Sequence, residues 1–361
     1  MKILFIGTNL YSGGAERVLS EIANGLYLLG HKIFVFTMEE NNRIIYPLNK
    51  NITLFENHRR KRLNFLKAVF SIRNCVKTNN PDVIISFLHV NNILTILGLL
   101  GLKKKLFITE HSHPAYDILH FPWNVLRNIL YMKATLLISV SNGVSDYFSF
   151  MSKSKKFVIN NPLPHEIEKY SKKQFLEKSS VNSDRHYIVA MGRLHNSKGF
   201  DILISAFSLI AEENIEWDLI IIGEGSERKA LEDLIKDLNL NNRVVLAGSI
   251  KNPFHYLRNS EIFVMSSLHE GFGNVIIEAM ACGLPVVSFN CPCGPGEIIT
   301  DNVDGILVET GNKFALAYTL KDLIKDTKKR RRIASAGIKR SKDFEISEII
   351  KKWEKLLKAK V

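Results

Sequence analysis

The sequence is short of the features that define several classes of protein. Its four cysteines, Cys75, Cys282, Cys291 and Cys293, have no spacing typical of a disulfide framework and form no CxxC pair, so we expect reduced thiols and no metal site. The longest apolar run, residues 93–102, has about half the length that a helix needs to cross a membrane. The opening MKILFIG lacks the long apolar core and cleavage site of a secretory signal. These absences predict a cytoplasmic protein without a membrane span.

Acidic residues are scarce in the first half of the chain. Residues 1–165 contain 20 Lys and Arg but 9 Asp and Glu, whereas the remainder contains 29 and 27, and the formal net charge of the whole chain is +13. A basic field on one half suits a surface that meets anionic lipid or nucleic acid. The alternative is that the excess lysine only keeps the protein soluble.

Short apolar runs separated by helix-length segments recur along the chain. Most are continuous rather than alternating, as expected for parallel strands covered by helices on both faces. They are KILFIG, KIFVFTM, DVIISFL, KLFITE, TLLISVS and KFVIN, then YIVAMG, DLIIIG, RVVLAG, EIFVMS, LPVVSF and GILVE. The 361 residues suffice for two cores. We therefore predict an α/β protein with two tandem Rossmann-like domains, residues 1–167 and 184–341, with the polar segment 166–185 as linker and a ligand in the cleft between them.

Two glycines, Gly13 and Gly14, stand between the first predicted strand and a predicted helix over residues 16–29. Without a Cβ, they would let backbone N–H groups at the positive end of the helix approach a phosphate. The spacing differs from GxGxxG, which argues against a nicotinamide or flavin dinucleotide. The alternative is that both glycines serve only a tight turn.

A cationic loop opens the second domain, between a strand and a predicted helix over residues 200–211. Arg193 and Lys198 lie five residues apart in GRLHNSKG. A guanidinium can bind a diphosphate through two parallel hydrogen bonds and an ammonium acts as a point charge, so the pair would neutralise such a group without a metal. The alternative is that both are solvated loop cations.

The segment EGFGNVIIEAMACGLPVV carries the most specific pattern in the chain. A glycine-rich turn leads into a helix whose first backbone N–H groups can receive anionic or hydroxyl oxygens. The turn consists of Gly271, Phe272, Gly273 and Asn274. Glu270 and Glu278 flank it eight residues apart, so one could meet a sugar and the other a ribose diol. The alternative is one carboxylate at a helix start and one exposed helix glutamate.

Together these motifs resemble glycosyltransferase family four, whose members have the GT-B fold of two Rossmann-like domains. SGGAER near the start, GRL and KG in the second half, and the two glutamates carry the resemblance over essentially the whole chain. It implies that Arg193 and Lys198 bind the donor diphosphate and that Gly13 and Gly14 face the phosphates from the other domain.

The same resemblance implies roles for the remaining site residues. Glu270 and the turn after it would contact the transferred sugar, Glu278 the ribose hydroxyls, and His111, in TEHS at the end of a predicted strand, the reacting sugar. The nucleobase pocket would use the loop Gly248, Ser249 and Ile250. The implied reaction is a retaining transfer without cofactor or metal. Its catalytic residues would be His111, Glu270, Arg193 and Lys198, and the segment 342–361 would cross back onto the first domain.

A predicted helix over residues 58–77 carries two different stripes. One, suited to the domain core, consists of Phe65, Val69, Ile72 and Val76. The other lies nearly opposite and consists of Arg59, Leu63, Leu66, Phe70, Arg73 and Lys77. This mixture of cations and large apolar side chains, with Arg62 beside it, favours a helix that lies on anionic lipid. The alternative is an exposed basic helix.

Further runs sharpen the resemblance. SGGAERV, ISFLHVNN, TEHS and KDFEIS followed by KKWEKLL are similar to family members that extend lipid-diphosphate-linked oligosaccharides, including bacterial N-acetylgalactosamine transferases. This implies a UDP-linked hexose or N-acetylhexosamine as donor and a polyprenyl-diphosphate-linked glycan as acceptor. The basic stripe would hold the lipid diphosphate at an anionic membrane surface, which predicts a peripheral position at the inner face of the cytoplasmic membrane.

Two other functions stay open from the sequence. The net charge and the basic run RRKR at residues 59–62 are compatible with a nucleic-acid-binding protein, although we recognise no nucleic-acid module and expect no such partner. A GT-B sugar-nucleotide epimerase is the nearer alternative. It would need acidic groups placed to deprotonate the sugar.

Overall fold

The computed structural model describes residues 1–11, 13–41, 44–57, 65–117, 121–169 and 185–361. The chain forms two compact units: unit 1 comprises Met1–Pro162 and Glu345–Val361, and unit 2 comprises Leu163–Phe344. The predicted divisions at 167 and 341 lie within five residues of these, whereas the predicted second domain begins at 184 and unit 2 already begins at Leu163. Most of the predicted linker 166–185 lies outside the described residues. Each unit has its own sheet and its own hydrophobic core.

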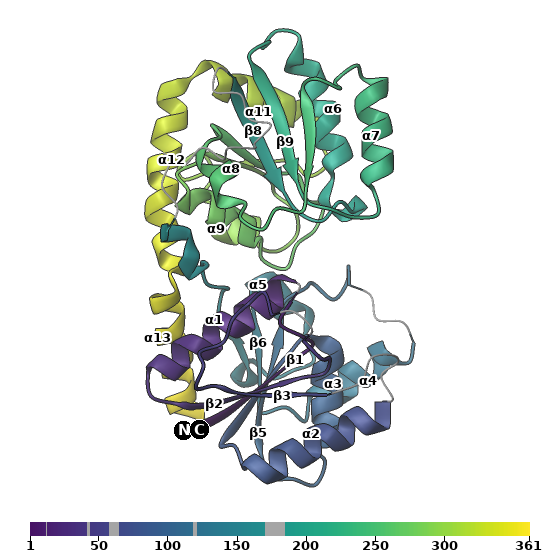
Figure 1. The fold of residues 1–361 in the computed structure, drawn as a ribbon, viewed down its shortest axis with the longest axis vertical. Helices are drawn as coiled ribbons and strands as arrows, with labels where there is room; N and C mark the ends of the chain where they lie inside the picture. The colour runs from purple at the N-terminus through teal and green to yellow at the C-terminus, as the bar shows by residue number, and fades with distance from the viewer. Residues whose placement is uncertain (12, 42–43, 58–64, 118–120, 170–184) are drawn as a thin grey trace. The chain divides into compact units, whose positions relative to one another are not determined.

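Unit 1 is built on a parallel sheet of seven strands in the order β3-β2-β1-β4-β5-β6-β7 (Figure 1). The central strands are buried along nearly their whole length, which explains their continuous apolar sequences. The strands are β1 (Lys2–Gly7), β2 (Lys32–Thr37), β3 (Thr53–Glu56), β4 (Val83–Phe87), β5 (Lys105–Glu110), β6 (Leu136–Ser139) and β7 (Lys156–Val158).

Strand β3 corrects the sequence analysis, which predicted no strand between residues 38 and 81. It has four residues, none of them fully buried, and lies at the edge of the sheet beside β2. An edge strand covered on one side lacks the continuous apolar run by which the other strands were predicted.

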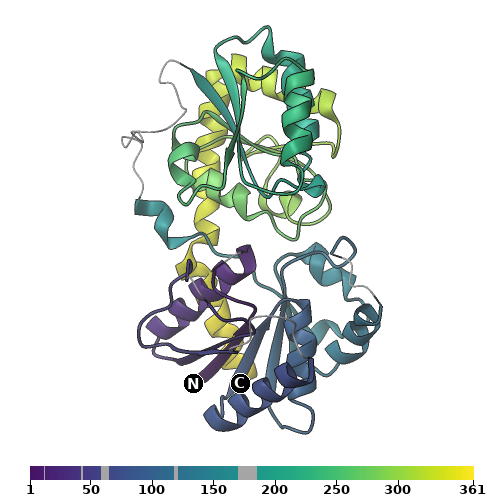
Figure 2. The ribbon, with the colours of Figure 1, turned by 45° about the vertical axis from the view of Figure 1, so that its right-hand side comes forward.

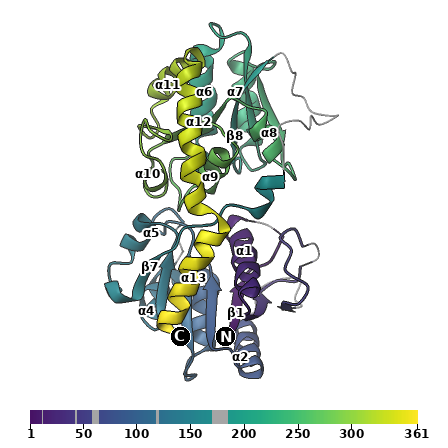
Figure 3. The same cartoon turned by 90° about the vertical axis from the view of Figure 1, so that its left-hand side faces the viewer.

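The helices of unit 1 cover both faces of this sheet. They are α1 (Gly14–Leu28), α2 (Phe65–Asn79), α3 (His89–Gly98), α4 (Trp123–Tyr131), α5 (Asn142–Tyr147), the 3-10 turn η1 (Lys153–Lys155) and α13 (Ile346–Lys360). Helices α2 and α4 both pack against α3, and α13 packs beside α1, as Figure 3 shows. The first and last residues of the chain therefore lie close together (Figures 1 and 2).

Helix α13 completes the core of unit 1, as the resemblance to GT-B enzymes implies. Its buried face includes Ile349 and Trp353, which join the cluster around β1 and β2. Gly25 of α1 allows the close approach, because a Cβ there would overlap the side chain of Ile350. His31 Nε2 lies 2.7 Å from Glu354 Oε2 and adds a polar contact at the rim.

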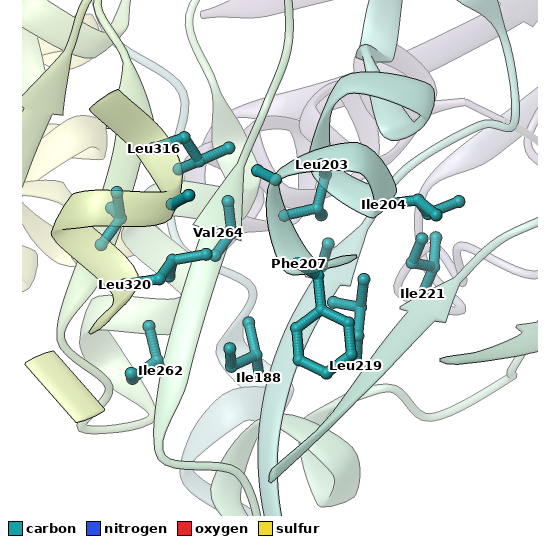
Figure 4. Packing of buried hydrophobic residues seen from close by; sticks show 14 of the residues in the cluster. Ile188, Leu203, Ile204, Phe207, Leu219, Ile221, Ile262, Val264, Leu316 and Leu320 are labelled. Carbon is teal, nitrogen blue, oxygen red and sulfur yellow. The ribbon is translucent and has the colours of Figure 1, made fainter. Parts of the chain in front are cut away.

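Unit 2 repeats the architecture with a six-stranded parallel sheet in the order β10-β9-β8-β11-β12-β13. The strands are β8 (His186–Met191), β9 (Trp217–Ile222), β10 (Val244–Gly248), β11 (Ile262–Met265), β12 (Val286–Phe289) and β13 (Ile306–Val308). The central strands are buried on both faces, and Figure 4 shows Phe207, from the helix after β8, against Leu219 of β9.

The helices of unit 2 follow the strands in regular alternation. They are η2 (His165–Lys169), η3 (Asn196–Lys198), α6 (Phe200–Ala211), α7 (Arg228–Asp237), α8 (Phe254–Arg258), α9 (Asn274–Ala281), α10 (Pro295–Ile298), α11 (Lys313–Lys325), α12 (Thr327–Ser341) and η4 (Lys342–Phe344). Two Rossmann-like parallel sheets with a helix returning to the first confirm the predicted fold class. In the part of the chain that the structure describes, no helix is both long and apolar enough to span a bilayer.

Candidate functional site

Strand order selects one place on each sheet for a ligand. In unit 2 the chain moves outward in one direction from β8 through β9 to β10 and in the other from β11 to β13. Ligands of doubly wound sheets bind beyond the carboxyl ends of the two strands at which the order reverses. These strands are β8 and β11 in unit 2, and β1 and β4 in unit 1.

The loops after β8 and β11 bring Lys198 and Glu270 together. Lys198 Nζ donates to Glu270 Oε1 at 2.5 Å, and the Ser267 hydroxyl donates to the same oxygen at 2.7 Å. The Lys198 side chain is 26% exposed and that of Glu270 is 15% exposed, so the ion pair is still open to solvent. Sequence reasoning identified both charged residues but missed Ser267, whose role depends on contacts that no motif encodes.

Hydrogen bonds between the two loops hold this pair in place. The Ser266 hydroxyl donates to the carbonyl of Lys198 at 2.8 Å, and the Leu268 N–H donates to the carbonyl of Ser197 at 2.8 Å. Gly199 lies so close to the Ser266 carbonyl that a Cβ would overlap it. The two predicted motifs are therefore parts of one rigid structure at the switch point of the sheet.

Arg193 lies on the same loop and has a different environment. Its side chain is exposed, and it forms no ion pair with any of the described residues, whereas its neighbour Leu194 is fully buried. The Leu194 N–H donates to the carbonyl of Glu224 at 2.9 Å and fixes the loop. The Arg193 guanidinium is thus presented to solvent by an anchored backbone.

The glycine-rich turn before α9 is more buried than the sequence suggests. Gly271, Phe272 and Gly273 are buried and Asn274 is partly exposed. Gly273 has a φ of 101° at the N-terminal cap of α9, a conformation that favours glycine. The predicted contact of this turn with a sugar stays a prediction.

Glu278 lies on the inner side of α9. It is 2% exposed. Burial raises the pKa of the neighbouring Cys282 thiol to about 12. The charge of Arg258 lowers this pKa and the charge of Glu278 raises it, so both charged groups lie close to Cys282 and to each other. The contact of Glu278 with a ribose stays a prediction.

The predicted nucleobase loop begins at the end of β10. Gly248 has a φ of 76°, and its carbonyl accepts a hydrogen bond from the Gly223 N–H at 2.9 Å. Ser249 is exposed and Ile250 is partly buried. Close to Gly248 lies an ion pair that sequence reasoning missed: the Arg228 guanidinium donates to both Glu224 carboxylate oxygens. A glutamate four residues before an arginine was the available signal.

A third loop, after β12, reaches the same region of unit 2. Gly294 packs on the backbone of Phe272, and a Cβ there would overlap the Phe272 carbonyl. Burial raises the pKa of the Cys291 thiol to about 12, and the nearby Glu270 raises it further. All four cysteines are free thiols. Among the described residues, no three His, Cys, Asp or Glu side chains converge on a metal position.

In unit 1, the local geometry of the loop after β1 explains why it contains a glycine at position 13. Gly13, with a φ of 92°, precedes the first residue of α1, and the Glu16 carboxylate fills the space that a Cβ would need. This carboxylate already lies at the positive end of the helix. A phosphate contact for Gly13 and Gly14 stays a prediction.

His111 follows β5, next to β4. Its Nε2 lies 3.0 Å from the Thr109 hydroxyl, and its ring stacks on Phe87 with centroids 5.0 Å apart. Burial of the imidazole lowers its pKa to about 4, although a hydrogen bond with Asn161 opposes the shift. His111 is therefore neutral near pH 7, able to exchange hydrogen bonds but carrying no charge.

A buried polar network beside His111 was missed by sequence reasoning. Glu110 at the end of β5 accepts hydrogen bonds from the Tyr131 hydroxyl and, at 3.3 Å, from Asn92 Nδ2. Asn92 also donates to the Thr109 carbonyl at 3.0 Å. Burial raises the pKa of Glu110 to about 7, although Tyr131 lowers it. The network ties α3 and α4 to the strand end that carries His111.

The predicted lipid-facing stripe on α2 is exposed in part. Phe70 is 60% exposed and Lys77 is exposed, but Arg73 donates to the carbonyls of Gly98 and Leu100 at 3.0 and 2.7 Å. The Arg73 guanidinium thus caps the end of α3, and its predicted contact with an acceptor lipid stays a prediction. Arg59 and Arg62 lie outside the described residues.

The predicted core stripe of α2 needs a correction. Ile72 and Val76 are fully buried, but the third buried residue is Ala68, whereas Phe65 and Val69 are only partly buried. Gly98 of α3 allows α2 to approach closely, because a Cβ there would lie 3.0 Å from the Val69 carbonyl oxygen and 3.3 Å from the Ile72 side chain.

Two protein-family models match the chain. The model described as Glycosyltransferase Family 4 matches residues 12–166, and the model described as Glycosyl transferases group 1 matches residues 171–340. The two matches fall on the two halves of the molecule.

Characterised relatives match over nearly the whole length. An alpha-1,4-N-acetyl-D-galactosaminyltransferase of Campylobacter jejuni, named for GalNAc-alpha-(1->4)-GalNAc-alpha-(1->3)-diNAcBac-PP-undecaprenol, is 29% identical and covers 99% of this chain and 98% of its own. A second transferase of that organism is named N-acetylgalactosamine-N,N'-diacetylbacillosaminyl-diphospho-undecaprenol 4-alpha-N-acetylgalactosaminyltransferase. It is 30% identical and covers 93% of this chain and 94% of its own.

Solved structures share the fold. Anabaena HepE, solved in complex with UDP and glucose, superposes with a TM-score of 0.82 over 99% of this chain and 100% of its own, at 22% identity. A sucrose-phosphate synthase from Thermosynechococcus elongatus reaches a TM-score of 0.84 at 18% identity, over 99% of this chain and 98% of its own.

Proposed function

Because the chain belongs to glycosyltransferase family 4, we propose that it transfers a hexose or an N-acetylhexosamine from a UDP-sugar to a polyprenyl-diphosphate-linked glycan, with retention of configuration. The observation that carries this proposal is the placement of Lys198, Glu270 and Arg193 beyond the carboxyl ends of β8 and β11. That is where a doubly wound sheet binds a nucleotide.

The two cations suit a departing diphosphate. Arg193 is exposed and can bind through a bidentate fork, whereas Lys198 is held by Glu270 until another anion competes for it. A diphosphate carries more charge than one carboxylate, so it would draw the ammonium away from Glu270. The freed carboxylate could then accept hydrogen bonds from sugar hydroxyls.

Stabilisation of the leaving group would be the main catalytic term, with no need for a metal. As charge develops on the diphosphate, donors already aimed at it lower the barrier without reorganisation. We propose that the acceptor hydroxyl attacks from the face that the diphosphate leaves, through an oxocarbenium-like state. A paired acid and nucleophile, as in retaining hydrolases, is not part of this proposal.

His111 would contribute hydrogen bonds rather than charge. With a pKa lowered to about 4 it stays neutral at the pH of the cytoplasm, so it can bind a sugar hydroxyl without opposing the positive charge that develops on the sugar ring. Its position after β5, anchored by the Glu110 network, supports a fixed contact.

The identities of donor and acceptor rest on analogy. HepE, which shares only the fold, was solved with UDP, and the Campylobacter jejuni relatives are named for undecaprenol-linked acceptors and for N-acetylgalactosamine transfer. These names support glycan or polysaccharide assembly as the setting. An acceptor of this kind would place the enzyme at the inner face of the cytoplasmic membrane, with Phe70 and Lys77 of α2 toward anionic lipid.

The test is a screen of nucleotide sugars against a synthetic prenyl-diphosphate sugar acceptor. We expect one UDP-hexose or UDP-N-acetylhexosamine to give a product with the anomeric configuration of the donor by NMR, at the same rate with and without EDTA. An inverted product, or loss of activity in EDTA, would refute retention or metal independence. Isomerisation of the donor without acceptor would favour an epimerase.

A further inference from the structure

Helix α4 has an apolar stripe that faces away from the sheet. Val125, Ile129 and Met132, the last at the C-terminal cap, lie at spacings of four and three residues and are 45%, 54% and 54% exposed. Phe121, which precedes the helix, is 82% exposed. The opposite face of the helix is buried. Single exposed apolar residues are ordinary, but three along one face of a short helix, with a fourth just before its start, form a patch that calls for a partner.

Helix α2 extends this patch. Leu66 and Phe70 are 62% and 60% exposed. Both α2 and α4 pack against α3, and the rings of Phe65 and Trp123 join them with centroids 5.4 Å apart. Right-handed crossovers place α2, α3 and α4 on the same face of the sheet. Helices α2 and α4 therefore belong to one layer on this face of the unit 1 sheet (Figure 1).

The charges of this layer have one sign. Neither α2 nor α4 contains an aspartate or glutamate. Lys67 and Lys77 of α2 and Lys133 after α4 are exposed and have no ion-pair partner among the described residues. Lysine is depleted in protein interfaces, and two copies of one basic face would repel each other, whereas apolar residues next to lysines suit an anionic bilayer.

We propose that the outward faces of α4 and α2 form one membrane-docking surface, with the α4 stripe inserted at the boundary between headgroups and acyl chains. The lysines would contact anionic headgroups around it. The inference deepens the proposed function, since it rests on a lipid-linked acceptor to bring the enzyme to a membrane. It adds α4, which the sequence analysis did not single out, as the inserting element.

Vesicle sedimentation of the full-length protein tests the stripe. We expect Val125→Ser/Ile129→Ser to weaken binding to phosphatidylglycerol vesicles by about tenfold, because two apolar side chains lose their contact with the acyl region. The matched control is Phe314→Ser/Tyr318→Ser on α11 of unit 2, whose side chains are 66% and 77% exposed and should not matter. Equal binding by wild type and the α4 variant overturns the proposal.

A fluorescent probe separates insertion from surface attraction. In vesicles with brominated acyl chains, Ile129→Trp should show added quenched, blue-shifted emission, and Phe314→Trp should not. An unquenched Trp at position 129 overturns insertion. Sedimentation velocity tests whether a second copy of the chain covers the α4 stripe instead of lipid. If the wild type is a dimer and Val125→Ser/Ile129→Ser converts it to monomers, the stripe is a protein interface and the proposal fails.

Transfer assays make the failure of this inference distinguishable from failure of the proposed function. With a short-chain, water-soluble prenyl-diphosphate sugar, the α4 variant should match the wild-type rate, but with a vesicle-embedded acceptor it should be slower by about tenfold. If wild type binds vesicles through α4 yet transfers no sugar, the proposed function fails and the docking surface stands. If wild type transfers sugar but does not bind vesicles, the proposed function stands and the docking surface fails.

Discussion

Helix α7 of unit 2 and helix α4 of unit 1 both lie outside a parallel sheet, yet they present different side chains to solvent. On α7, Arg228 pairs with Glu232 and Lys229 with Asp233, each one turn apart, and no large apolar side chain is exposed. On α4, four-residue spacing is used instead by Val125 and Ile129, and no carboxylate is present. The exposed face of α7 thus forms ion pairs within itself, whereas the exposed face of α4 carries apolar side chains and forms none with any residue that the structure describes.

The difference indicates where an external partner is expected. Arg193 resembles Lys67 and Lys77 of α2 and Lys133 after α4 in this respect, because it is exposed and, within the described residues, lacks an ion pair. A cation without a carboxylate beside it is available to an anion that arrives from solution. For Arg193 we expect a diphosphate, and for the lysines a lipid headgroup.

The largest effect on catalysis should follow from removing the ammonium of Lys198, which is ion-paired with Glu270. Lys198→Ala should lower kcat by about two to three orders of magnitude, because a donor aimed at the leaving group is lost. Lys229→Ala, which removes an ion-paired lysine of α7, should leave kcat unchanged. Steady-state kinetics of both variants with the UDP-sugar from the screen measure the contrast. Near-normal turnover of Lys198→Ala would remove its catalytic role.

Glu110 is the opposite of the carboxylates on α7, since it is buried and bound by neutral donors. Burial raises the pKa of Glu110 from 4.5 to about 7. Between pH 4.5 and pH 7 this carboxyl is therefore protonated in the folded protein but ionised in the unfolded chain. Its contribution to stability is thus present below pH 4.5 and is lost as the pH rises through 7. Relative to wild type, Glu110→Gln should gain up to about 3 kcal/mol between pH 5 and pH 8.

Urea denaturation at several pH values measures this difference. His111 acts in the opposite direction, because its pKa is lowered to about 4, and stability from this group is lost as the pH falls below 6.5. Comparison of Glu110→Gln with wild type at each pH cancels the His111 contribution. If the two proteins kept a constant difference in free energy of unfolding across the range, Glu110 would have an ordinary pKa.

Long buried strands and loop motifs could be predicted because their signals are local. All twelve predicted strands are present, and among the residues that the structure describes the edge strand β3 is the only strand that was missed. The charged residues Lys198 and Glu270 were predicted from motifs 72 positions apart, and the reversal of strand order at β8 and β11 explains why they meet. Strand order is a property of the sheet, so the motifs alone predict the loops but not the contact.

Side chains whose role depends on distant partners could not be predicted. Arg73 fits a lipid-facing stripe by periodicity, but the carbonyls that it caps lie 25 and 27 residues away on the end of α3. Tyr131 reaches Glu110 only because α4 packs next to α3. The α4 stripe had a local signal, apolar residues at a spacing of four, but the same spacing predicts a buried face until the packing of the helix is known.

A smaller loss should follow from keeping the charge of Arg193 but changing its shape. Arg193→Lys should lower kcat/KM about 10- to 100-fold, since a lysine cannot form the two parallel hydrogen bonds of a guanidinium to a diphosphate. Arg331→Lys, at an exposed arginine of α12, is the control and should leave kcat/KM unchanged. Equal kinetics of Arg193→Lys and wild type would indicate a purely electrostatic contact.

An effect on membrane binding, and not on catalysis, tests the lysines of the docking surface. Each exposed lysine near an anionic membrane contributes about 1 kcal/mol to binding, so Lys67→Gln/Lys77→Gln should weaken attachment to phosphatidylglycerol vesicles by about 2 kcal/mol and flatten its salt dependence. Lys229→Gln/Lys236→Gln on α7 should have no effect, because that helix belongs to the surface that carries its own carboxylates. On neutral phosphatidylcholine vesicles, Lys67→Gln/Lys77→Gln should bind as wild type does, since only the apolar stripe acts there. A loss of the same size on both kinds of vesicle would mean that these lysines support the fold of α2 rather than the contact with lipid.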